Sequence, residues 1–240
     1  MHPITQHHTT AYSSSSRPLS HLFNRSLLIV LLLSGVPTVG LLSAPAYAST
    51  AVNADIDDNT DLATLQRLAN NGDVMAQFYL AVRYYHGQGV RQNYDKAVQL
   101  FQQAANQGYA IAQHNLGLMY ANGQGVRQDY ARAAQLFQLA ANQGLIEARY
   151  SLGVVYYKGQ DYTKAAELYQ QAADQGLRDA QHNLGLMYYN GQGVRQDYTK
   201  AAQLFQLAAN QGDAKAQNGL GGLYYNGQGV RQDYTKAAQL

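Results

Sequence analysis

The chain has 240 residues, of which 46% are hydrophobic and 13% are charged, a composition that supports a packed core and argues against wholesale disorder. The formal net charge is +2, but Arg17 and Arg25 lie in a segment that we expect to be removed, and the other 15 Lys and Arg balance the 15 Asp and Glu. A neutral surface has no electrostatic footprint for nucleic acid, and the absence of cysteine excludes disulfides, thiolate metal ligands and a cysteine nucleophile.

Residues 1–48 have the pattern of a secretory signal peptide. Two arginines precede an apolar run, LLIVLLLSGV at residues 27–36, and the small residues Ala46 and Ala48 follow it. This order predicts export with cleavage after Ala48, and therefore a periplasmic or secreted protein. A retained membrane anchor is the alternative. It is disfavoured because the apolar run is shorter than the roughly 20 residues that a spanning helix needs and because Pro37 interrupts the segment.

The rest of the chain is repetitive. Residues 49–60 are polar and are interpreted as a flexible lead-in, and residues 61–73 match the second half of a repeat, which predicts an N-terminal capping half-repeat. The sequence from His114 to Gly144 recurs from His182 to Gly212 with only three differences. Fixed-period identity of this kind indicates a repeat architecture, with about five units over residues 74–240, the last of them truncated.

Each unit begins with an amphipathic helical pattern. In the second unit, Ala112, Leu116 and Tyr120 are spaced at i, i+4 and i+8, on one face of a helix, and Gly117 lies beside the leucine. A glycine inside a helix costs roughly 1 kcal/mol relative to alanine. Its recurrence in later units therefore predicts a close contact, which we expect to be with the backbone of the partner helix.

A Gly-Gln-Gly-Val loop then leads to a second helix. Asp129 is a natural N-cap, small and aromatic residues follow at helical spacing from Tyr130 to Ala141, and Gly144 is expected to end the helix. The loops lack the preceding strand and the following Lys-Ser/Thr of phosphate-binding loops. Their glycines are therefore interpreted as turn residues.

The strings Ala-x-x-x-Leu-Gly-x-x-Tyr, Gly-x-Gly-Val-x-x-Asp-Tyr-x-x-Ala-Ala and Phe-x-x-Ala-Ala-x-Gln-Gly resemble the Sel1-like repeat, a relative of the tetratricopeptide repeats, from about Val74 to Leu240. The resemblance implies an all-α, right-handed α-solenoid of antiparallel helix-pair repeats that serves as an adaptor surface. Two departures stand out. Leucine occupies a position that is commonly aromatic in the family, and the third unit lacks four loop residues around Gly159, so its connection should be tighter. The cysteine-rich branch linked to β-lactams is not resembled.

Chemistry-bearing residues are sparse. His86, His114 and His182 are the histidines after residue 48, and stacked repeats should hold the last two apart, so no metal site is expected. Ser151 is the only serine after residue 49, with no base partner apparent, so we predict no enzyme activity and no cofactor. One arginine per long loop could bind an anionic polymer, although local ion pairs are the favoured interpretation: Arg91, Arg127, Arg195 and Arg231.

The candidate partner-binding residues are large side chains at positions that face the concave groove in related helical repeats. Tyrosine provides a large contact area at low entropic cost, and semi-exposed packing is an equally open interpretation. The candidates are Phe78, Tyr85, His114, Tyr150, Tyr157, His182, Tyr189 and Tyr225.

The leading hypothesis is an exported scaffold that binds a peptide or protein element along this groove. A cell-wall or carbohydrate binding module is the alternative, because aromatic ladders also stack on sugar rings. In the fifth unit we expect a full first helix over 214–225 and only a stub over 233–240, which would leave Leu220, Leu223 and Tyr224 partly uncovered. Fraying or self-association through this end would follow.

Overall fold

The computed structural model describes residues 56–240, so the predicted signal peptide and its cleavage site lie outside the described residues. After α1 (Leu62–Asn70), these residues form five helix pairs and no strand. The first helices of the pairs are α2 (Val74–His86), α4 (Ala110–Asn122), α6 (Ile146–Lys158), α8 (Arg178–Asn190) and α10 (Ala214–Asn226). The second helices are α3 (Tyr94–Asn106), α5 (Tyr130–Asn142), α7 (Tyr162–Asp174), α9 (Tyr198–Asn210) and α11 (Tyr234–Gln239).

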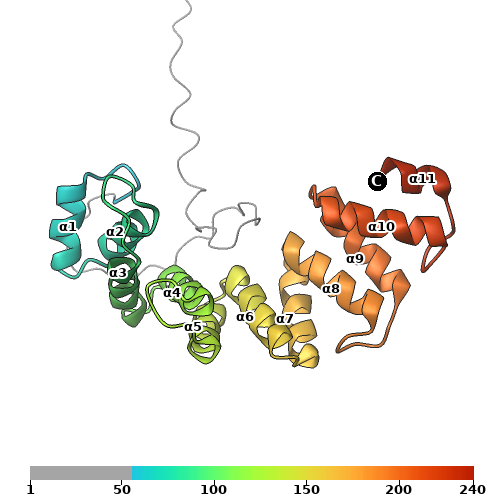
Figure 1. Cartoon of the computed structure of the whole chain (residues 1–240), viewed down its shortest axis with the longest axis horizontal. Coiled ribbons are helices and arrows are strands. Elements are labelled where there is room, and N and C mark those ends of the chain that lie inside the picture. Colours follow the sequence, from blue (N-terminus) through green and yellow to red (C-terminus); the bar gives the residue numbers. More distant parts are fainter. Residues whose placement is uncertain (1–55) are drawn as a thin grey trace, which may run out of the picture.

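The helices stack in chain order. Each helix packs chiefly against the helix before it and the helix after it, and Figure 1 shows the pairs following one another along a curved rod whose two ends, α1 and α11, rise on the same side. The predicted all-α solenoid of antiparallel helix pairs is confirmed.

The expected helix boundaries are formed by the expected residues. Asp129 accepts a hydrogen bond from the backbone amide of Arg132 at 2.9 Å, which satisfies one of the free amides of the first turn of α5. Gly144 has a φ of +91° and follows the C-cap residue Gln143. It therefore supplies the left-handed residue just beyond the helix end.

The recurring helical glycine packs against an aromatic ring in repeats two to four, so the expectation of a backbone contact was wrong there. In repeat five a Cβ on Gly221 would lie 3.3 Å from the backbone carbonyl oxygen of Ala237 in α11, as expected. A Cβ on Gly117 would lie 2.6 Å from Cε1 of Phe137, and Phe137 is 1% exposed at the centre of its pair. Gly153 has the same relationship to Tyr169, at 2.8 Å. Each ring occupies the space that a side chain would need.

Successive repeats are also joined by pairs of glutamines, one buried in a first helix and one exposed at the end of the following second helix. Gln113 of α4 donates from Nε2 to the carbonyl of Ala105 in the preceding repeat at 3.2 Å. Its own Oε1 accepts from Nε2 of Gln143 at 2.8 Å. Gln77 and Gln181 are bonded in the same way, whereas the third repeat has Arg149 at this position.

The loop glycines belong to turns, as predicted, and in repeats two, four and five they also let the loop approach the preceding repeat. Gly125 has a φ of +65°, and a Cβ there would lie 2.6 Å from the carbonyl oxygen of Tyr94. In the third repeat the short connection leaves both α6 and α7 at 13 residues, as expected, with Gln160 at a φ of +63°.

The last pair has the expected full α10 and short α11, of 6 residues. The expectation that Leu220 and Leu223 are partly uncovered was wrong. They are 1% and 0% exposed, because they pack with Phe205 and the alanines of α9. Tyr224 is half-buried.

Candidate functional site

The predicted groove residues occupy two positions of the first helices. The fifth position holds Phe78, His114, Tyr150 and His182, and the twelfth holds Tyr85, Tyr157, Tyr189 and Tyr225. These residues do not form one exposed surface, because those of the first two repeats, Phe78, Tyr85 and His114, are buried.

Phe78 and Tyr85 belong to the core of the first repeat. Phe78 is 2% exposed, and its ring lies 5.2 Å from that of Tyr109, edge to face. The ring of Tyr85 contacts that of Tyr94 at a tilt, with centroids 5.1 Å apart, and its hydroxyl accepts from Nε2 of Gln124 in the next loop at 2.9 Å. Neither side chain offers a partner appreciable surface.

His114 is buried as well, and it has a partner that the sequence did not suggest. Its Nε2 lies 3.0 Å from Oγ of Ser151 in the next repeat, which corrects the view that Ser151 has no base partner. The pair is not a nucleophile–base pair, since both residues are buried and Nδ1 of His114 has no hydrogen-bonding group to orient it. Burial lowers the pKa of His114 to about 4, so the ring is neutral at pH 7.

Tyr150 and His182 are half-buried and belong to a polar layer between α6, α8 and α10. Nδ2 of Asn183 donates to the Tyr150 hydroxyl at 3.0 Å, and burial raises the pKa of that hydroxyl to about 12. Nδ1 of His182 lies 3.7 Å from Oδ2 of Asp213, and burial lowers the pKa of His182 although Asp213 opposes the shift. Arg178 lies 3.9 Å from the same carboxylate oxygen.

The accessible candidates are Tyr157, Tyr189 and Tyr225, which we call the tyrosine row. Tyr157 is 36% exposed and Tyr225 is 60% exposed, and Tyr189 is half-buried. Each ring meets the first tyrosine of the following helix edge to face, at 5.1 Å, 5.3 Å and 5.2 Å. Because the rings are held in place, contact with them would cost little side-chain entropy.

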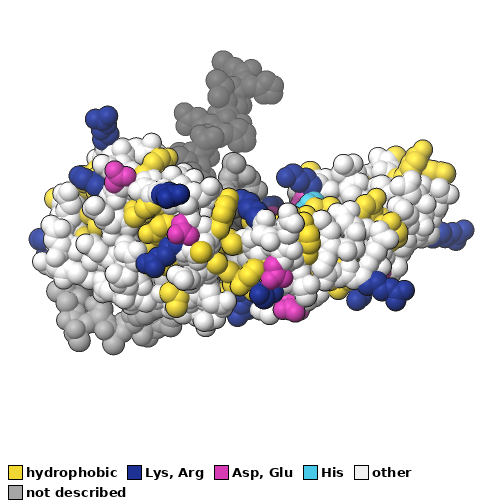
Figure 2. Space-filling view, turned by 60° about the horizontal axis from the view of Figure 1, so that its bottom comes forward, with side chains coloured by type: hydrophobic (Ala, Val, Ile, Leu, Met, Phe, Trp, Pro, Cys, Tyr) yellow, Lys and Arg dark blue, Asp and Glu magenta, His cyan; other side chains and the backbone are white. Residues whose placement is uncertain are grey.

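The molecular surface is mixed in character. Figure 2 shows one face on which hydrophobic side chains form separate streaks across the rod, with basic and acidic side chains dispersed between them. This face has no single charged patch of the kind that binds nucleic acid.

Clusters of metal-binding side chains and membrane-spanning helices are both absent from residues 56–240. No three His, Asp or Glu side chains there gather closely enough to hold a metal ion. None of the helices in this range is long and apolar enough to cross a bilayer.

The expected ion pairs of the loop arginines are not formed. Arg91, Arg127, Arg195 and Arg231 are exposed, and none of the four lies within ion-pair distance of a carboxylate belonging to residues 56–240. Their positive charges are therefore available to solvent or to a ligand.

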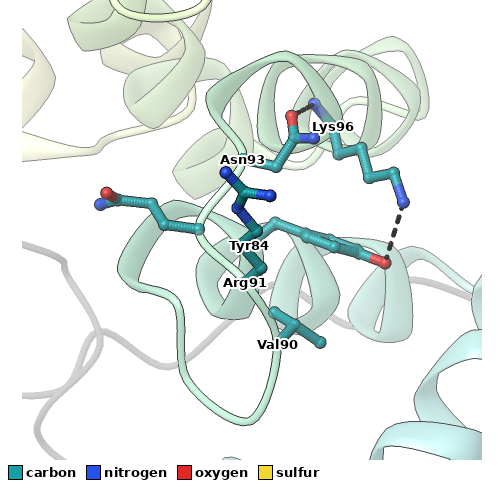
Figure 3. A pocket seen from close by; sticks show the side chains of 6 residues that line it. Tyr84, Val90, Arg91, Asn93 and Lys96 are labelled. Atoms are coloured by element: carbon teal, nitrogen blue, oxygen red, sulfur yellow. Dashed lines mark hydrogen bonds between the residues drawn. The ribbon is translucent and has the colours of Figure 1, made fainter.

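A pocket of about 510 Å³ lies beside the first of these arginines, between the loop of repeat one and the start of α3. Figure 3 shows Arg91 and Lys96 on either side of the Tyr84 ring, with Val90 below it. Nζ of Lys96 lies 3.5 Å from the Tyr84 hydroxyl and 4.8 Å from the ring centroid. Gln92 and Asn93 complete the lining.

Sequence reasoning missed the lysine of this pocket. A lysine placed three residues after the N-cap lies over the first-helix tyrosine of its own repeat in four of the five units, a cation–π arrangement. The signal was present in the sequence as a recurring spacing. The pairs are Lys96 with Tyr84, Lys164 with Tyr156, Lys200 with Tyr188 and Lys236 with Tyr224.

Stacked helix pairs with one recurring sequence define an α-solenoid repeat protein, a class that binds through extended surfaces rather than a catalytic cleft. The model of the Sel1 repeat matches residues 74–109, 110–145, 146–177, 178–213 and 214–240. The chain therefore belongs to the Sel1 repeat family, whose members are generally protein–protein interaction scaffolds without enzyme activity.

Two solved structures are similar. A protective antigen present in uropathogenic Escherichia coli strains, displaying an SLR fold, is 40% identical with a TM-score of 0.70, over 72% of this chain and 38% of its own. A Sel1 repeat protein from Oxalobacter formigenes is 31% identical with a TM-score of 0.63, over 75% of this chain and 81% of its own. The chain thus spans 38% of the length of the first relative. No curated protein sequence matches it.

Proposed function

We propose that the chain is an exported, non-enzymatic scaffold that holds a peptide or protein element against the tyrosine row. The observation that carries this proposal is the exposure of Tyr157 and Tyr225, 36% and 60%, on helices whose other tyrosines are half-buried. Leu186, 38% exposed, precedes Tyr189 by three residues in α8, a spacing that puts the two side chains on the same side of the helix. Tyrosine is enriched among the residues that contribute most of the binding energy at protein interfaces.

The location of binding follows from burial. Phe78, Tyr85 and His114 are each less than 9% exposed, so the first two repeats present no comparable side chains at the groove positions. The proposed contact surface is therefore confined to α6, α8 and α10, and the first repeats support it by stacking.

Export is proposed on the order of basic flank, apolar run and Ala-x-Ala site in residues 1–48. The partner would then be a periplasmic or extracellular peptide or protein. Outside the cytoplasm, a polysaccharide of the cell wall would be the competing partner, since sugar rings also stack on exposed tyrosines.

The test is a pull-down from the compartment in which the protein is found. The wild type is compared with a Tyr157→Ala/Tyr189→Ala variant and with a control that truncates Leu139 and Leu207, which are 51% and 49% exposed on the second helices. Proteins lost with the tyrosine variant but kept by the control support the scaffold. Co-sedimentation with peptidoglycan, without any such protein, would instead support the wall-binding module.

A further inference from the structure

The pocket at the start of α3 differs from the equivalent positions of repeats four and five in one residue. Repeat four has the same residue types at five of the six lining positions, namely Tyr188, Val194, Arg195, Gln196 and Lys200. The sixth position is Asn93 in repeat one and Asp197 in repeat four, and repeat five likewise has Asp233.

The frame around this position is the same in both repeats. Nε2 of Gln92 donates to the carbonyl of Tyr85 at 2.8 Å, and Nε2 of Gln196 donates to that of Tyr189 at 2.8 Å. The lysine lies 4.8 Å above its tyrosine ring in repeat one and 5.0 Å in repeat four. The substitution of Asn for Asp therefore changes the charge of the pocket but not the hydrogen bond of its glutamine or the position of its lysine.

The N-cap side chain performs the same task in the two repeats. Oδ1 of Asn93 accepts from the amide of Lys96 at 3.0 Å, and Oδ1 of Asp197 accepts from that of Lys200 at 3.0 Å. Asparagine does this without a charge, so Arg91 and Lys96 face the pocket of repeat one with no carboxylate among the lining residues. Asp95 is adjacent in sequence but is exposed and is not part of the lining.

We propose that this pocket binds an anionic oxygen group, a carboxylate or a phosphate ester, on the peptide or protein partner. The inference deepens the proposed function and rests on it for the carrier of the group. The planar guanidinium of Arg91 can donate to two oxygens at once. The ammonium of Lys96, positioned by Tyr84, supplies a second positive charge. In repeats four and five the N-cap carboxylate adds a negative charge among the lining residues, which lowers the net positive charge of the pocket by one.

The test is a titration of the 15N-labelled full chain, followed by the side-chain and amide resonances of each pocket. The probes are acetate, inorganic phosphate, and one peptide made with glutamate, phosphoserine or glutamine at a single position. We expect saturable shifts at Arg91, Gln92 and Lys96 with the glutamate or phosphoserine peptide and none with the glutamine peptide. Which of the two charged peptides binds more tightly identifies the source of the oxygen group.

Matched variants isolate the charge of the N-cap. Asn93→Asp keeps the cap and should weaken binding about tenfold, and Arg91→Ala should weaken it roughly fivefold or more. Asp197→Asn should create new saturable shifts at Arg195 and Lys200. The proposal is overturned if the wild type shifts equally in repeats one, four and five, if no shift saturates, or if Asn93→Asp has no effect. A Tyr157→Ala/Tyr189→Ala variant should still bind the anion. Loss of partner binding at the tyrosine row can therefore be distinguished from loss of anion binding in this pocket.

Discussion

A Cβ atom added to Gly117 would lie 2.6 Å from Cε1 of Phe137, closer than non-bonded carbon atoms approach one another. A Cβ atom added to Gly185 would likewise lie 2.7 Å from Cε1 of Phe205. The glycine of the first helix and the aromatic residue of the second are therefore a matched pair, and the ring is buried because the glycine has no side chain.

The first prediction concerns this pair. Gly117→Ala should lower the free energy of unfolding by about 1–3 kcal/mol, because the added methyl group overpacks the core by more than alanine gains in helix propensity. The control is Gly222→Ala in α10, where no atom lies within 4 Å of the added Cβ. That change should raise the stability by roughly 0.5–1 kcal/mol. Urea denaturation measures both, and equal effects at the two sites would refute the packing role.

A second prediction concerns the glutamine pairs between repeats. Gln113→Leu removes the hydrogen bond to the buried carbonyl of Ala105 and the acceptor for Nε2 of Gln143, so it should cost about 1–3 kcal/mol. The reciprocal change, Arg149→Gln, introduces the usual residue in repeat three and should gain up to about 1 kcal/mol. Denaturation curves that move in the same direction for both variants would contradict the account.

Acid should destabilise the protein through His114. Burial lowers its pKa from 6.5 to about 4, so between these pH values the unfolded chain binds a proton that the folded chain does not. Stability from this group is therefore complete above about pH 6.5 and falls as the pH drops toward 4. The wild type should lose on the order of 2–3 kcal/mol more than His114→Phe over this range.

Comparison of the two pH profiles isolates His114 from its neighbours. Burial also lowers the pKa of His182 and raises that of Glu147, and both effects persist in the variant. Parallel profiles of unfolding free energy against pH for wild type and variant would show that His114 is not the titrating group.

The fold could be predicted from the sequence because its local signals agree with one another. The spacing of Leu116 and Tyr120 places them on one helix face, and Asp129 has the residue type of an N-cap. The near-identical sequence of the units indicates stacked copies of one repeat. The partner of Gly117 could not be predicted, since periodicity shows which face is buried but not which side chain of the next helix fills it.

The candidate site was predicted less completely. Periodicity identified Tyr157 and Tyr189 but could not separate them from Phe78 and Tyr85, because equivalent positions differ in burial according to what neighbouring repeats supply. Tyr85 is covered through Gln124 of the following loop. The lysine of the pocket beside Arg91 recurs at a fixed spacing from the first-helix tyrosine, but that spacing does not reveal that the loop and the start of α3 enclose a pocket.

Export gives a prediction at the N-terminus. The protein recovered from the periplasm or medium should begin at Ser49 when its N-terminus is sequenced, because Ala46 and Ala48 satisfy the small-residue requirement of the processing site. Full-length protein retained in the cytoplasm would contradict the assignment.

The most direct test of the scaffold function is site-specific photocrosslinking in the native compartment. A photoreactive phenylalanine analogue is placed at Tyr157 or Tyr225 in the tyrosine row, and at Leu139 or Leu207 on the second helices as a control. The account predicts that the tyrosine-row positions give a discrete protein adduct, identifiable by mass spectrometry, that the control positions do not give. Adducts only at Leu139 and Leu207, or none at Tyr157 and Tyr225, would contradict it.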